Sequence, residues 1–174
     1  MDIKRIKRHV ILGILFLLPV IFLFFLYPST HNYNALDIVK KDVFELENFS
    51  SDSDIILKNH ITVLGFFGTD PLKNVIAASN LKELVYDKFK GFKTFQIVIV
   101  QPDNTTQETE ELRREISRYE ELKYWHFVFG KPDNIKNIFD SLKSNTQLEG
   151  NLSSNNVFIV DKDLSQRGRL DDRT

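Results

Sequence analysis

The first hydrophobic feature of the chain is an unbroken apolar run near its N-terminus. Residues 10–27 read VILGILFLLPVIFLFFLY and contain no charged side chain. Because an α-helix rises about 1.5 Å per residue, this run forms a helix about 27 Å long, close to the hydrocarbon thickness of a bilayer. The apolar core of a cleaved signal peptide is usually shorter, about 7 to 15 residues, and no A-x-A-like cleavage site follows Tyr27. We therefore expect residues 10–27 to form a transmembrane helix.

The basic residues before this run predict the direction in which the chain crosses the membrane. Residues 1–9 contain Lys4, Arg5, Lys7 and Arg8 against one acidic residue, Asp2. Because positive charge next to a span stays in the cytoplasm, we expect residues 1–9 to be cytoplasmic and the chain after residue 27 to lie outside. In a bacterium with an inner membrane, this topology describes a single-pass inner-membrane protein with a periplasmic domain.

Beyond the apolar run, strand-like and helix-like patterns alternate. Continuous apolar stretches rich in β-branched and aromatic residues, typical of strands buried on both faces, occupy residues 61–68, 95–100, 126–130 and 157–160. Residues at helical spacing lie between and after them, at Leu72, Val75, Ile76, Ser79, Leu84, Val85 and Phe89, at Leu112, Ile116, Tyr119 and Leu122, and at Ile135, Ile138, Phe139 and Leu142. This alternation predicts an α/β fold in which helices flank a central sheet.

The same patterns set the expected domain boundaries. After the span, the polar residues 28–42 read as a linker or a short juxtamembrane helix. Residues 43–165 are enough for a single domain with one core. Residues 166–174 mix arginines with aspartates and are expected to be a solvated tail or a segment that a partner orders.

The junction after the first predicted strand is the candidate site. Residues 66–74 read FFGTDPLKN, in which Asp70 is a favourable N-cap and Pro71 a favourable first helical residue. In an α/β sheet, ligands and reactive groups gather at such junctions, at the carboxyl ends of the strands. A second helix start is expected at Thr105, which has the spacing of a capping box with Glu108.

Four short motifs accompany this order of elements. They are Phe44, Leu46, Asn48 and Phe49 before the first strand, FFGT at 66–69, WHFVFG at 125–130 and VFIVD at 157–161. Together they resemble the membrane-anchored SCO proteins, which are thioredoxin-fold factors of cytochrome oxidase copper assembly. The resemblance covers about residues 43–165 and implies a thioredoxin-like central sheet.

The chain departs from the SCO pattern where that family carries its chemistry. The pattern C-P-x-x-C follows the threonine in the family, whereas this chain has Asp70 and Asn74 in place of the two cysteines. The position of the copper-binding histidine is taken by Ser153, and the chain contains no cysteine. Copper(I) prefers thiolate and imidazole ligands, and disulfide exchange requires a thiolate. Neither the copper cofactor nor the redox activity of the family is therefore expected here.

Two functional hypotheses remain at this stage. In the first, the protein is a non-catalytic, tethered thioredoxin-like domain that docks partners as an accessory or assembly component of a membrane complex, for example a respiratory one. In the second, it is a residual enzyme or a chaperone for a hard metal ion that uses Asp70 and Asn74. A pocket that opens at Asp70 would favour the second hypothesis, and a filled corner the first.

Charge and residue spacing narrow the expected partners further. The whole chain has a net charge of −1 and residues 1–9 contribute +3, so residues 10–174 carry −4 and have no basic excess for nucleic acid. His60 and His126 have no second histidine at metal-ligand spacing. We expect no metal and no cofactor, and no motif identifies a small-molecule substrate.

Overall fold

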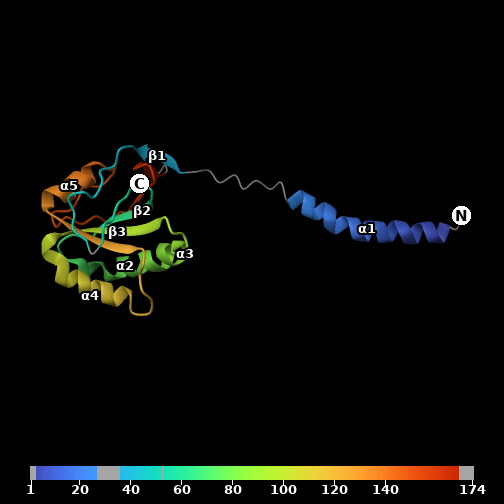
Figure 1. Ribbon diagram of the computed structural model, residues 1–174, viewed down its shortest axis with the longest axis horizontal. Helices are drawn as coiled ribbons and strands as arrows, with labels where there is room; N and C mark the ends of the chain where they lie inside the picture. The colour runs from blue at the N-terminus through green and yellow to red at the C-terminus, as the bar shows by residue number, and fades with distance from the viewer. Residues whose placement is uncertain (1–2, 27–35, 52, 169–174) are drawn as a thin grey trace. The chain divides into compact units, whose positions relative to one another are not determined.

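The computed structural model describes residues 3–26, 36–51 and 53–168 (Figure 1). The chain forms two units, one containing helix α1 (Ile3–Leu26) and the other beginning at Leu36. Each unit is described by itself. Tyr27, most of the predicted linker and residues 169–174 of the predicted tail lie outside the described residues.

Helix α1 contains the apolar run identified in the sequence. Its segment Ile6–Phe24 is long and apolar enough to cross a bilayer, and none of it is buried inside the protein. Pro19 lies within the helix, as is tolerated in membrane spans. Because no protein surface covers these apolar side chains, α1 fits a single-pass membrane anchor.

The second unit is built on one mixed six-stranded sheet with the strand order β1-β6-β5-β2-β3-β4. The strands are β1 (Asp37–Lys40), β2 (Ile61–Phe66), β3 (Phe95–Pro102), β4 (Trp125–Gly130), β5 (Phe158–Val160) and β6 (Gln166–Gly168). Strands β2, β3 and β4 are parallel to one another, and β5, β6 and β1 add to them by antiparallel pairing. The four strands predicted from apolar runs are confirmed, with small changes at their ends.

Helices cover both faces of this sheet (Figure 1). After β2 the chain forms a 3₁₀ turn η1 (Pro71–Asn74), helix α2 (Val75–Leu81), a π-helical turn η2 (Lys82–Tyr86) and the short α3 (Asp87–Phe89). A 3₁₀ turn η3 (Asp103–Thr105) and α4 (Thr106–Ile116) follow β3, and α5 (Pro132–Asp140) follows β4. Helix α5 packs on one face through Ile135 and Ile138, and α2 and α4 pack on the other through Ala78 and Leu112. The predicted α/β fold with flanking helices is confirmed.

The sheet extends further at both ends of the domain than the sequence predicts. Residues 37–40, expected to be linker, form β1, and residues 166–168, expected to be tail, form β6. Both strands are short, with sequences DIVK and QRG, so neither has an apolar run long enough for a sequence pattern to detect. Their pairing is reinforced by Arg167, whose Nε donates to Asp161 Oδ2 at 2.6 Å and whose guanidinium also donates to the Leu36 carbonyl at 3.1 Å.

Two predicted helical faces are partly wrong. Ile76 and Leu84 are 76% and 63% exposed, and the buried residues of this segment are Ala78 and Tyr86. The buried face of α2 passes through Val75 and Ala78, and Ile76 points away from it. Further along, the wider π-helical turn at 82–86 shifts the face and leaves Leu84 outside. Helix α4 ends at Ile116, and Tyr119, expected on its apolar face, is 92% exposed.

The predicted capping box at Thr105 does not form. Thr105 occupies the N-cap position of α4, but its side chain makes no cap hydrogen bond to the helix. Its hydroxyl donates instead to the Pro102 carbonyl at 2.8 Å, and the Thr105 carbonyl accepts a bond of 2.7 Å from the Thr109 hydroxyl. The preceding 3₁₀ turn η3 places the Pro102 carbonyl within reach of the Thr105 hydroxyl, which therefore bonds backward and not to the first N–H groups of α4.

Candidate functional site

The corner after β2 is formed by a residue that only glycine suits. Gly68 has a φ of +67°, and a Cβ built on it would lie 2.5 Å from the Asn151 carbonyl oxygen and 2.9 Å from the Ser153 backbone nitrogen. Its neighbour Thr69 donates its backbone N–H to the same Asn151 carbonyl at 2.9 Å. The strand therefore turns into η1 directly against the segment 151–153, which is far away in the sequence.

Ser153, at the position of the SCO histidine, is held by this contact. It forms an isolated antiparallel bridge with Phe67, and the next residue, Ser154, donates its backbone N–H to the Phe66 carbonyl at 3.0 Å. The Ser153 hydroxyl lies 2.7 Å from Asn151 Oδ1 and 3.2 Å from a Glu149 carboxylate oxygen. Its polar atoms are thus engaged within its own loop.

Asp70 occupies the predicted N-cap position but does not cap with its side chain. Pro71 follows it as the first residue of η1, as predicted, and no side-chain cap hydrogen bond forms. The Asp70 carboxylate instead forms an ion pair with Lys73 Nζ at 2.7 Å, and this hydrogen bond, together with the charge of Asp70, raises the pKa of Lys73. Both side chains are substantially exposed, so the pair contributes little to stability.

Asn74 completes the corner from the opposite side. Its amide Nδ2 donates to the Phe67 carbonyl at 2.9 Å and to the Asp70 carbonyl at 3.4 Å. In this way the side chain ties the end of β2 to the start of η1. The amide acts as a backbone clamp, a role that the sequence-based hypothesis of a reactive corner did not include.

The structure places Asp70, Asn74 and Ser153 at one corner. Asn74 and Ser153 both contact Phe67, one through its side chain and the other through the backbone bridge. The carboxylate, the amide nitrogen and the hydroxyl each have a partner within the protein. Within residues 3–26, 36–51 and 53–168, no group of three or more histidine, aspartate or glutamate side chains is placed to hold a metal ion.

A groove of about 750 Å³ includes Thr69, the residue before Asp70, in its lining. Lys136 and Phe139 of α5 line one side, and Leu148 and Leu152 of the loop that follows α5 line the other. Neither Asp70 nor Asn74 lines it. No motif in the sequence predicts this groove, and its local signal is the pair of leucines inside an otherwise polar stretch.

His126 lies on the edge strand β4 and is partly buried. Burial lowers its pKa, and the positive charges of Arg113 and His60 lower it further. The imidazole is therefore neutral at pH 7. His60 lies before β2, and its Nδ1 is 3.1 Å from the Lys58 carbonyl oxygen. In this geometry, both histidines have the surroundings of structural residues of the domain.

Comparison with solved structures identifies the fold. No protein-family model matches the chain, and no curated protein matches it. Among solved structures, the domain is similar to BsSco, a member of the Sco family of cytochrome c oxidase assembly proteins, with a TM-score of 0.50 and 15% identity over 78% of this chain and 86% of that chain. It is equally similar to a yeast mitochondrial 1-Cys peroxiredoxin, with a TM-score of 0.50 and 15% identity over 78% of this chain and 65% of that chain.

These similarities show the fold, which is thioredoxin-like, as the sequence motifs predict. The BsSco structure concerns a disulfide switch, and the peroxiredoxin structure a thiol-resolving mechanism. This chain has no cysteine, so it keeps the fold without the thiols. It is a divergent form of the fold, and its function rests on its own residues.

Proposed function

We propose that this protein is a non-catalytic, membrane-anchored interaction module that serves as an accessory or assembly component of a membrane complex. The domain is the working part, and α1 keeps it at the membrane. Redox chemistry and copper(I) chemistry need thiolate or imidazole donors, and the corner supplies a carboxylate, an amide and a hydroxyl instead.

The observation that carries this proposal is the use of the corner for internal contacts. Asn74 clamps the Phe67 carbonyl, Ser153 bridges Phe67, and Asp70 pairs with Lys73. A reactive site needs groups aimed at a cavity, and neither Asp70 nor Asn74 lines the nearby groove. A fold that has lost its reactive pair still offers its surface to partners.

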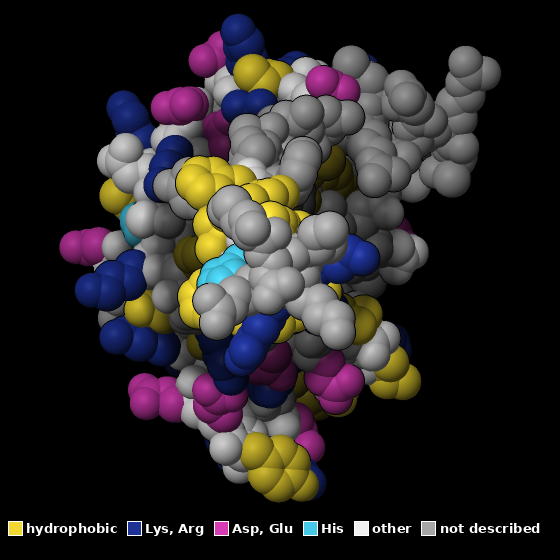
Figure 2. All heavy atoms as spheres, turned by 90° about the vertical axis from the view of Figure 1, so that its right-hand side faces the viewer, with side chains coloured by type: hydrophobic (Ala, Val, Ile, Leu, Met, Phe, Trp, Pro, Cys, Tyr) yellow, Lys and Arg dark blue, Asp and Glu magenta, His cyan; other side chains and the backbone are white. Residues whose placement is uncertain are grey.

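The proposed cellular setting comes from charge and from analogy. The four basic residues before the span favour a cytoplasmic N-terminus, which places the domain outside. BsSco belongs to a family of cytochrome c oxidase assembly proteins, so a respiratory complex is the proposed partner. Side chains of both charge signs are visible in Figure 2, and no large basic patch of the kind that binds nucleic acid is seen among the described residues in that view.

The alternative, a hard-metal chaperone or residual enzyme at Asp70 and Asn74, has less support. A cation at Asp70 would have to displace the Lys73 ammonium, which already lies 2.7 Å from the carboxylate. The amide of Asn74 presents its nitrogen, which is a donor and not a metal ligand, to the corner. The nearby groove does not include either residue.

The experiment that tests the proposal combines complementation with partner capture. A deletion strain receives wild-type protein or Asp70→Asn, each tagged, and the full chain is purified in mild detergent for mass spectrometry. We expect equal complementation and the same subunits of a membrane complex with both proteins. A stable, normally abundant Asp70→Asn protein that fails to complement would refute the interaction module and move the site to Asp70.

Two further measurements test its parts separately. The wild-type protein should neither reduce insulin disulfides nor bind copper(I) in a competition assay, and submicromolar copper(I) binding would contradict the proposal. Protease added to intact spheroplasts should digest the domain. Survival of the domain until the cells are lysed would reverse the proposed topology.

A further inference from the structure

The opposite end of the central sheet carries an exposed cluster of aromatic and basic side chains. Phe89 at the end of α3 is 46% exposed, and Phe92 in the following turn is 63% exposed. Their rings lie 6.4 Å apart, and the Phe89 ring is 5.6 Å from that of buried Phe95, the first residue of β3. Lys88 and Lys93, both exposed, flank the two phenylalanines. We call Lys88, Phe89, Phe92 and Lys93 the aromatic–lysine surface.

The backbone holds this surface in one shape. The Phe92 N–H donates to the Phe89 carbonyl at 3.0 Å, and the Phe95 N–H donates to the Phe92 carbonyl at 3.0 Å. Two successive turns therefore present Phe89 and Phe92 at the point where the chain enters β3. A rigid presentation of exposed rings lowers the entropy cost of burying them against a partner.

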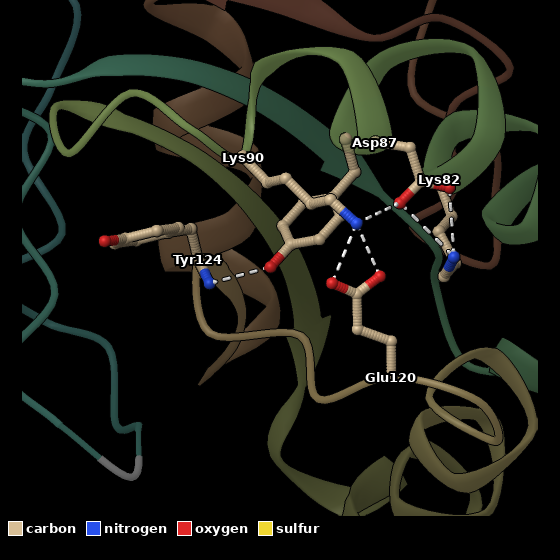
Figure 3. A network of polar contacts seen from close by, with 6 residues as sticks. Lys82, Asp87, Lys90, Glu120 and Tyr124 are labelled. Atoms are coloured by element: carbon tan, nitrogen blue, oxygen red, sulfur yellow. Dashed lines mark hydrogen bonds and ion pairs between the residues drawn. The ribbon is translucent and has the colours of Figure 1, made fainter.

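A network of ion pairs lies beside this surface (Figure 3). Asp87 pairs with Lys82 and Lys90, and Lys90 also binds the Glu120 carboxylate. The Tyr124 N–H donates to the hydroxyl of buried Tyr86 at 3.3 Å. This bond fixes the loop between α4 and β4, which also contains Glu120, against η2. The acidic groups here are thus paired, whereas in the described part of the chain Lys88 and Lys93 have no ion-pair partner.

The length of chain between α1 and the domain limits the distance between the domain and the bilayer. Ten peptide links join Leu26 of α1 to Leu36 of the domain, and a fully extended chain of that length spans at most about 35 Å. A domain of this size has a radius of gyration of about 14 Å. If α1 crosses a bilayer, every point on the domain surface can come close to that bilayer.

The chemistry of the surface fits a bilayer better than a second copy of the chain. Aromatic rings are favoured at the membrane interface, and lysines extend their ammonium groups to anionic lipid headgroups. In a symmetric dimer through this surface, Lys88 and Lys93 would face the same lysines of the other copy, which is unfavourable.

We propose that the aromatic–lysine surface docks the domain onto the anionic surface of the bilayer that holds α1. This inference goes beyond the proposed function and needs only the membrane anchor. Because β2 and β3 are parallel and Phe92 precedes Phe95, the surface lies at the amino-terminal end of the sheet, opposite the Asp70 corner. Docking therefore turns the corner and the groove at Thr69 away from the lipid.

Three glycines allow a direct test on the full chain. They are Gly13 in α1, Gly91 between the two phenylalanines and Gly150 at the opposite end of the domain, and a Cβ added at any of them would meet nothing within 4 Å. Since the chain has no cysteine, Gly13→Cys, Gly91→Cys and Gly150→Cys each create a single site for an environment-sensitive fluorophore. The proteins are reconstituted in nanodiscs of phosphatidylcholine with or without phosphatidylglycerol, and quenching by spin-labelled lipids is measured.

The three positions separate the anchor from the docking. A probe at Gly13 should be quenched in every nanodisc, because it reports insertion of α1. A probe at Gly91 should be quenched by shallow spin labels when phosphatidylglycerol is present, and one at Gly150 should not. Quenching at Gly13 with equal, weak quenching at Gly91 and Gly150 overturns the docking alone. No quenching at Gly13 overturns the membrane anchor and the docking with it.

Matched variants identify the side chains responsible. In the Gly91→Cys protein, Phe92→Ser should lower the docked-to-undocked ratio roughly tenfold, and Lys88→Gln and Lys93→Gln should each lower it roughly fivefold in anionic discs. Ile76→Ser, which removes a comparably exposed apolar side chain at the other end, should leave it unchanged. Unfolding curves check that each variant is folded. An unchanged ratio in folded Phe92→Ser contradicts the proposal. A probe at Gly91 that reports an apolar environment in lipid-free detergent, where the protein is found to be a dimer, also contradicts it.

Discussion

The two ends of the central sheet differ in whether their notable side chains have partners within the protein. At the carboxyl end of β2, polar side chains gather at Asp70, Asn74 and Ser153, and each finds a partner inside the protein. At the amino-terminal end, Phe89 and Phe92 remain exposed although they are apolar. At the end whose sequence suggests chemistry, the candidate side chains are thus paired within the protein, whereas the end without any reactive motif exposes apolar rings. Apolar side chains left exposed therefore indicate a binding surface better than polar side chains that already have partners within the protein.

The largest effect expected from this contrast is at Gly68. Gly68→Ala should destabilise the protein by about 3 kcal/mol, because alanine is strained at a positive φ and its Cβ would meet the Asn151 carbonyl. Urea unfolding of the detergent-solubilised chain can be followed by Trp125, the single tryptophan, which is buried. The matched change at the other end, Gly91→Ala, should stay within about 0.5 kcal/mol. Equal effects at both glycines would remove this difference between the two ends.

Asn74 tests whether the corner is held together by its clamp. Asn74→Ala should cost about 1 to 3 kcal/mol, since it leaves the Phe67 carbonyl without its side-chain donor. Asn74→Asp should cost at least as much, because a carboxylate would face that carbonyl oxygen. The control at the opposite end is Lys88→Ala, which should be neutral within about 0.5 kcal/mol. A neutral Asn74→Ala, measured by the same unfolding assay, would mean that the clamp contributes nothing.

The stability should also depend on pH through His126. Burial lowers the pKa of this histidine in the folded protein, so below the ordinary value of 6.5 the unfolded chain binds a proton that the folded one resists. Stability should therefore fall as the pH drops below 6.5, by up to about 1.4 kcal/mol per pH unit, until the folded pKa is reached.

Unfolding curves at several pH values between about 5 and 7.5 measure this slope. His126→Gln should flatten it, whereas His60→Gln should flatten it only slightly, since His60 is a minor cause of the shift. The carboxylates Asp87 and Asp161, whose pKa values are lowered in the fold, contribute only in more acidic solution. A slope that survives in His126→Gln would assign the pH dependence to another group.

The smallest effect is expected at Asp70. A cap residue would make Asp70→Ala cost about 0.5 to 2 kcal/mol, as its sequence position suggests. Because the carboxylate pairs with exposed Lys73 instead, we expect both Asp70→Ala and Asp70→Asn to stay within about 0.5 kcal/mol of wild type. A larger loss for alanine than for asparagine, well above that limit, would show that Asp70 caps the helix in solution.

The amino-acid pattern alone establishes the apolar span, the four strands with continuous apolar runs and the succession of helices between them. Strands such as Ile61–Phe66 and Phe95–Pro102 are detectable because burial on both faces requires an unbroken apolar run. The resemblance of the motifs to the SCO proteins also points to the correct fold. It places Asp70, Asn74 and Ser153 at one corner without knowledge of any contact between them.

Long-range contacts settle which of the local signals are used. Strands β1 and β6 exist because residues about 130 positions apart pair with each other, and no local pattern records such a pairing. The cap at Asp70 is lost to Lys73, and a π-helical turn leaves Leu84 in solvent. Local propensities are worth about 1 kcal/mol or less, so one competing contact from elsewhere in the fold is enough to override them.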